Sequence, residues 1–148
     1  MRHKVPLRIV TIDEDGLHVF VDVLINGIPA VFVVDTGASR TVLDSKRISR
    51  FMKEEEAQFV EYGRPATGLG SNHMETRLLK IDLLKIGSFE CPDYETAVVD
   101  MSHVNIGYHS MNMPPVDGAL GSDILLKSQA ILDYRKSRLV MREVRNEK

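Results

Sequence analysis

The 148-residue sequence predicts a mostly β fold with one or two short helices. Two apolar, β-branched runs, residues 17–25 (LHVFVDVLI) and 28–34 (IPAVFVV), have the composition of strands. The Asn26-Gly27 dipeptide between them is the strongest short signal for a hairpin, because both residues accept positive φ. Similar strand-like runs recur along the rest of the chain, whereas helix signals are confined to short stretches.

The first half of the chain adds one strand and one short helix to this hairpin. Residues 7–12 (LRIVTI) read as a strand that ends at the turn-like DEDG. The hairpin strand that begins at Ile28 ends at Asp35. In residues 41–59, either Asp44 or Ser45 caps a short helix.

The middle of the chain predicts a long hairpin over residues 60–87. Its tip, residues 67–72 (TGLGSN), has two glycines and no bulky anchor, so we expect it to be exposed. Residues 95–101 form a further strand. Residues 102–115 are expected to be a loop, which is long enough to suggest a function.

The C-terminal segment closes the predicted fold. Residues 118–121 (GALG) form a tight turn of small residues, and either Ser122 or Asp123 caps the short helix that follows. Two strands then flank a turn at residues 135–137. Because no repeat or linker interrupts the pattern, we expect one domain over residues 1–148, with a core from about 7 to 141.

Composition narrows the function classes. The net charge is -2, from 19 basic and 21 acidic residues, which is too balanced for a nucleic-acid or membrane surface. No apolar run is long enough to span a bilayer and no signal peptide is recognised, so we expect a cytoplasmic protein without a membrane segment. The one cysteine, Cys91, forms no internal disulfide and is expected to be an ordinary residue.

Asp35 is the residue that points to chemistry. A carboxylate at the end of a buried-looking strand costs several kcal/mol unless it is hydrogen-bonded, neutralised or used. Thr36 then supplies a hydroxyl, and Gly37 allows close backbone approach. Asp-Thr-Gly alone is more often an ordinary turn than a catalytic motif, so the catalytic interpretation depends on the rest of the chain.

Two motifs resemble the retropepsin-like single-domain aspartic proteases, the retroviral-type aspartyl proteases. Residues 33–39 (VVDTGAS) resemble their active-site loop, and residues 117–125 (DGALGSDIL) resemble their second ψ-loop with its helix. The order of motifs matches from about residue 7 to 141. The resemblance implies a single-domain closed β-barrel with a flap hairpin.

The resemblance also implies roles for residues. Asp35 would be the catalytic carboxylate, supported by Thr36, Gly37 and Ala38. Ala38 lacks the hydroxyl found there in two-domain relatives, which implies a pH optimum that is mildly acidic to near neutral. The second ψ-loop residues, which would be structural, are Ala119, Leu120 and Gly121.

The expected partners follow from the single Asp-Thr-Gly. The chemistry needs two carboxylates, so the resemblance implies a homodimer that pairs two copies of Asp35 over a peptide or protein substrate. The flap would be residues 62–75. Leu69 would contact substrate, although an exposed tip leucine with no role is an equal alternative. The predicted flap contacts are Thr67, Gly68, Leu69 and Gly70.

The histidines raise the question of a metal site. His103 and His109 lie six residues apart without a cysteine or a metal-binding spacing, so we expect no metal and no cofactor. The predicted function is an aspartic endopeptidase. A non-catalytic module that keeps this fold for peptide binding or dimerisation remains the alternative.

Overall fold

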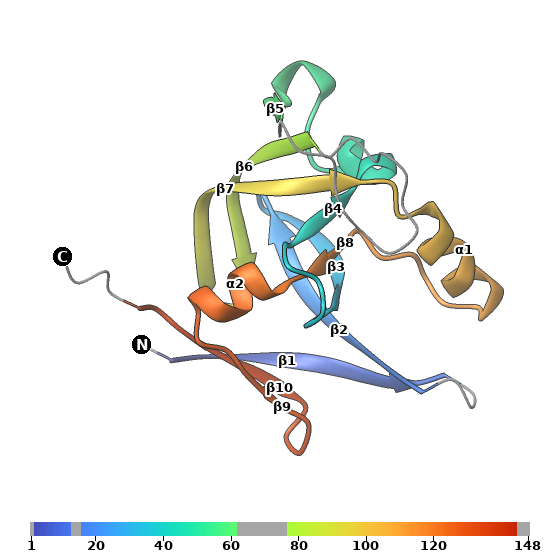
Figure 1. Cartoon of the computed structure of the whole chain (residues 1–148), viewed down its shortest axis with the longest axis vertical. Coiled ribbons are helices and arrows are strands. Elements are labelled where there is room, and N and C mark those ends of the chain that lie inside the picture. Colours follow the sequence, from blue (N-terminus) through green and yellow to red (C-terminus); the bar gives the residue numbers. More distant parts are fainter. Residues whose placement is uncertain (1, 13–15, 62–76, 145–148) are drawn as a thin grey trace.

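The fold is a β-barrel with short helices on its outside (Figure 1). The structure is a computed structural model that describes residues 2–12, 16–61 and 77–144. In these ranges the strands are β1 (Arg2–Thr11), β2 (Leu17–Ile25), β3 (Ile28–Val34), β4 (Val42–Asp44), β5 (Phe59–Glu61), β6 (Arg77–Ile86), β7 (Phe89–Val99), β8 (Gly118–Leu120), β9 (Ile131–Asp133) and β10 (Arg138–Arg142). The helices are η1 (Ser45–Arg50) and η2 (Glu54–Glu56), both 3₁₀, and α1 (Ser102–Ser110) and α2 (Ser122–Lys127).

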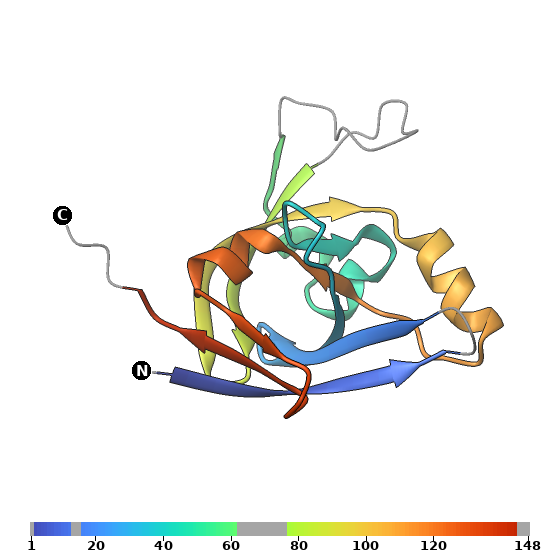
Figure 2. The same cartoon turned by 60° about the horizontal axis from the view of Figure 1, so that its bottom comes forward.

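The barrel closes through one additional strand pairing. The sheet order is β5-β6-β7-β4-β8-β3-β2-β1-β10-β9, and β6 also pairs with β2. That contact makes a closed ring of β6, β7, β4, β8, β3 and β2. The strands β1, β9 and β10 extend the sheet beyond the ring and lie together below it in Figures 1 and 2. The predicted mostly β, closed-barrel fold with few short helices is therefore confirmed.

Two hydrophobic clusters account for the packing. The larger one fills the barrel with side chains such as Phe32, Leu79 and Leu120, each 0% exposed. The smaller one includes Phe20 and Tyr108 and lies between α1 and the strands. Because successive strand residues point to opposite faces, the ring strands serve both clusters.

The predicted hairpin is confirmed. Antiparallel pairs run from Phe20 opposite Val33 to Ile25 opposite Ile28. Asn26 and Gly27 have φ of 50° and 81°, as a two-residue turn of this type requires.

The predicted loop over residues 102–115 is wrong for its first part, which forms α1. The Asp100 carboxylate accepts from Ser102 N at 2.8 Å, but Met101 at the N-cap position makes no side-chain hydrogen bond. Asn105 holds the helix instead, with its Nδ2 donating to Asp44 Oδ2 at 3.1 Å and its Oδ1 accepting from Val116 N at 2.8 Å. Tyr108 is also buried, so tertiary contacts stabilise the helix.

Several element boundaries also differ from expectation. The first strand begins at Arg2 because it pairs with β10, and β7 begins at Phe89 because it pairs with β6 along its length. The stretch expected to be a turn at residues 118–121 is mostly the strand β8, which pairs with β3 and β4. These pairings join distant parts of the chain, so local composition does not report them.

The two helix caps differ in outcome. Asp44 does cap its helix, with its side chain accepting from Lys46 N, but that helix is the short 3₁₀ element η1. For α2, neither Ser122 nor Asp123 is the cap. The N-cap position is Gly121, without a side-chain hydrogen bond.

Cys91 is buried on β7, and burial raises the pKa of its thiol to about 11. Since the thiolate is the reactive form, about a thousandth of the thiol is ionised at pH 8. We expect no reaction with an aromatic disulfide reagent in the native protein at pH 8, and one equivalent after denaturation. Rapid native reaction of one equivalent would contradict this burial.

Candidate active site

The Asp35 loop begins where β3 ends beside β8. The two strands are parallel, with Phe32 opposite Gly118 and Val34 opposite Leu120. The backbone N–H of Asp35 continues this ladder by donating to Leu120 O at 2.9 Å. The segment expected to be the second ψ-loop therefore fixes the backbone position of Asp35.

The loop itself is a tight turn around the carboxylate. Gly37 N donates to Asp35 Oδ1 at 3.1 Å, and Ala38 N donates to Asp35 O at 3.2 Å. Asp35, Thr36 and Gly37 are all exposed in the single chain. The sequence suggested a carboxylate in a buried setting. In one chain the carboxylate is instead exposed at the surface.

The start of α2 holds the other end of the loop. Ser122 donates to Ala38 O from both its backbone N and its Oγ, each at 2.8 Å. Two donors on one carbonyl restrict how far the loop can move away from α2. This anchor depends on a contact between residues more than eighty positions apart.

A half-buried carboxylate, Asp123, adds a third anchor whose role sequence reasoning missed. Its Oδ1 accepts from both N and Oγ1 of Thr41, each at 2.8 Å, and its Oδ2 accepts from the Tyr94 hydroxyl. Burial, followed by the hydrogen bond to Asp123, strongly raises the pKa of Tyr94, so its hydroxyl remains a donor. No sequence pattern linked these three residues, which come from different parts of the chain.

Gly121 lets these anchors approach each other. Its N–H donates to Thr41 Oγ1 at 2.9 Å. A Cβ on Gly121 would lie 2.4 Å from Arg40 C and 2.5 Å from Arg40 O, both backbone atoms. Only glycine leaves room for this crossing of the two loops.

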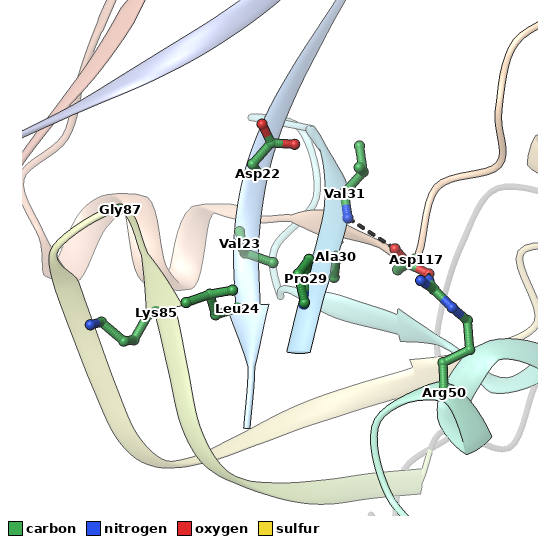
Figure 3. A pocket seen from close by; sticks show the side chains of 10 residues that line it. All are labelled: Asp22, Val23, Leu24, Pro29, Ala30, Val31, Arg50, Lys85, Gly87 and Asp117. Atoms are coloured by element: carbon green, nitrogen blue, oxygen red, sulfur yellow. Dashed lines mark hydrogen bonds and ion pairs between the residues drawn. The ribbon is translucent and has the colours of Figure 1, made fainter. Parts of the chain in front are cut away.

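Asp117 does not supply a second catalytic carboxylate. It lies at the level of Val31, four residues before Asp35, which corresponds to about 13 Å along the strand. Its side chain is 3% exposed, accepts from Val31 N at 2.9 Å and pairs with Arg47 at 2.6 Å and with Arg50. Figure 3 shows Asp117 beside Arg50 at the wall of a groove. The groove has a volume of about 530 Å³. Asp117 therefore has a structural role as the partner of two arginines.

The base of the expected flap is present. β5 and β6 are antiparallel, from Phe59 opposite Leu79 to Glu61 opposite Arg77. The expected flap contacts Thr67, Gly68, Leu69 and Gly70 lie outside the described residues, so their roles remain predictions.

Over the described residues, no group of three or more His, Cys, Asp or Glu side chains is placed to hold a metal ion. No helix among the described ranges has the length and hydropathy to cross a membrane.

A closed barrel that presents Asp-Thr-Gly at a strand end, beside a Gly-Ala-Leu strand and a short helix, defines the acid-protease class of fold. A family model described as "Aspartyl protease" matches residues 21–124 of the sequence. The chain therefore belongs to the aspartyl protease family.

Solved structures show the same fold. The chain is similar to a retropepsin-like aspartic protease from Rickettsia conorii, with a TM-score of 0.56, 17% identity and coverage of 95% of this chain and 92% of that one. The retroviral protease-like domain of Ddi1 from Leishmania major matches with a TM-score of 0.54, 15% identity and coverage of 84% and 88%. EIAV protease in complex with the inhibitor HBY-793 matches with a TM-score of 0.57, 25% identity and coverage of 84% and 99%. No curated protein sequence gives a significant match.

Proposed function

We propose that this protein is a homodimeric aspartic endopeptidase that hydrolyses peptide bonds with water activated between two Asp35 carboxylates. The observation that carries the proposal is the intact Asp-Thr-Gly loop, held open at the end of β3 by β8 and α2 in a chain of this family. These contacts restrict the conformations of the Asp35 loop, and a catalytic group must be held in this way in its reactive position.

The dimer is required because the chain contains one Asp-Thr-Gly. Two-fold symmetry brings the same loop of each subunit to the axis. Exposure of Asp35, Thr36 and Gly37 in the single chain leaves this loop available to a partner. Thr36 would then hydrogen-bond across the axis and hold the two loops in register.

The paired carboxylates would divide the acid and base work. Two carboxylates that lie so close together are not both ionised, because their negative charges repel. The pair therefore holds one proton. The ionised member accepts a proton from water, and the protonated member donates to the scissile carbonyl and then protonates the leaving amine. The two ionisations belong to the pair and not to one residue each.

The substrate would be an extended peptide. It would bind as an added strand through main-chain hydrogen bonds, with its side chains in alternate pockets. The hairpin whose base is β5 and β6 would close over it and exclude water.

Solution mass tests the proposal directly. We expect light scattering at micromolar concentration to give twice the 16.7 kDa of the chain, either alone or after addition of a statine-type inhibitor such as pepstatin. The inhibitor spans both carboxylates, so it stabilises the dimer by mass action. A monomer that ignores the inhibitor at every concentration would contradict the endopeptidase and favour the non-catalytic module.

A further inference from the structure

His18 on β2 lies just beyond the paired part of the β2–β3 hairpin, and so does Asp35 after β3. The last pair of this hairpin is Phe20 opposite Val33, and His18 and Asp35 each lie two residues further along, where His18 pairs with Val10 of β1. Residues directly opposite in an antiparallel pair share a face, as do residues two apart on one strand. His18 therefore lies at the level of Asp35, at the edge of the smaller hydrophobic cluster.

Tyr108 of α1 holds the His18 imidazole in place. The Tyr108 hydroxyl and His18 Nδ1 are 2.9 Å apart. The two rings meet edge to face with their centroids 5.4 Å apart, and His18 also stacks on Phe20 at 6.3 Å. The stack on Phe20 and the hydrogen bond at Nδ1 both restrict the orientation of the imidazole.

Asp35 acts electrostatically on Tyr108. Burial and, to a smaller extent, the negative charge of Asp35 raise the pKa of Tyr108. This supports the register argument that the carboxylate and the His18–Tyr108 pair are neighbours. Among the described residues Nε2 of His18 has no hydrogen-bond partner, and the side chain is half-buried.

We infer that His18, oriented by Tyr108, determines substrate specificity by donating from Nε2 to a carboxylate or amide side chain beside the scissile bond. When the Tyr108 hydroxyl donates to Nδ1, the imidazole proton resides on Nε2, which becomes a donor. Its complement is a substrate side chain that ends in a hydrogen-bond acceptor, such as glutamate or glutamine. The inference rests on the proposed endopeptidase function and adds a substrate class to it.

The test compares peptides rather than overall activity. A peptide that the wild-type protein cleaves is resynthesised with Glu, Gln or Leu at each position flanking the scissile bond. We expect kcat/KM at one position to favour Glu and Gln over Leu by about tenfold, the effect of one hydrogen bond. Equal preference for Glu and Gln would indicate a neutral imidazole, whereas a preference for Glu alone would indicate a charged one.

Two conservative variants then assign the preference. His18→Phe keeps the stack on Phe20, and Tyr108→Phe keeps the helix packing but removes the hydroxyl. We expect both to reduce the Glu/Leu and Gln/Leu ratios to near one. His103→Gln on the exposed part of α1 is the matched control and should keep the wild-type ratios. Wild-type ratios near one, or ratios unchanged in His18→Phe, would overturn the inference.

Failure of the proposed function is distinguishable from failure of this inference. If the wild-type protein cleaves no peptide, the endopeptidase proposal fails, and the same peptides are used as fluorescent probes in anisotropy titrations. Tighter binding of Glu and Gln peptides that is lost in His18→Phe would retain the specificity role in a binding module. Equal binding of all peptides by both proteins would reject it. Tyr108→Phe is interpreted only alongside its circular dichroism spectrum and Tm, since Tyr108 is buried.

Discussion

Asp35→Asn is expected to lower kcat by at least about a thousandfold while the protein stays folded. General acid–base work contributes factors of this order, and groups that act as a pair are not replaced by the remaining member. The substituted side chain still has an oxygen to accept from Gly37 N, so the loop should keep its turn. The measurement is peptide turnover at saturating substrate, with Tm as the check on folding.

The matched control for this experiment is Asp22→Asn. Asp22 is an exposed carboxylate on β2, on the same hairpin, and pairs with Arg8 at 2.5 Å. Its loss should cost no more than about 1 kcal/mol and leave turnover unchanged. Full turnover in Asp35→Asn would remove Asp35 from the chemistry, and no turnover in either form would favour the non-catalytic module.

Gly121→Ala is expected to destabilise the fold by about 3 kcal/mol or more. The backbone of Gly121 is extended, with φ of -101° and ψ of -179°, so conformation is not the obstacle. The obstacle is space, because the new Cβ would lie 2.4 Å from the backbone carbon of Arg40. The Arg40–Thr41 backbone must shift, and the Asp35 loop moves with it. We expect a Tm about 10 °C lower, with a loss of turnover.

Gly107→Ala serves as the control for that substitution. Gly107 lies in α1, and nothing is within 4 Å of the position where its Cβ would be. Alanine favours a helix more than glycine does, so the change should be neutral or stabilising by about 0.5–1 kcal/mol. If Gly121→Ala were as stable as Gly107→Ala, the packing of the two loops would be looser than these distances indicate.

Local patterns were sufficient for much of the fold. The β2–β3 hairpin follows from alternating apolar residues and an Asn-Gly turn, both of which act within a few residues. Asp35 was recognisable because a carboxylate after an apolar strand needs an explanation. The barrel was expected only because two short contiguous motifs, in their order, resemble the retropepsin-like family.

Local sequence was therefore enough to place the hairpin and Asp35, and the single Asp-Thr-Gly is the reason why we propose a second copy of the chain. The supports of the Asp35 loop are visible only in the three-dimensional structure, because Ser122 bonds to Ala38 and Asp123 bonds to Thr41 from distant segments. Tyr94 in turn donates to Asp123. Residues 102–110 form the helix α1 for a similar reason. Asn105 and Tyr108 stabilise it through contacts with distant residues that no local pattern encodes. The physical reason is the same in each case. Hydrogen bonds and packing between residues far apart in sequence outweigh weak local preferences.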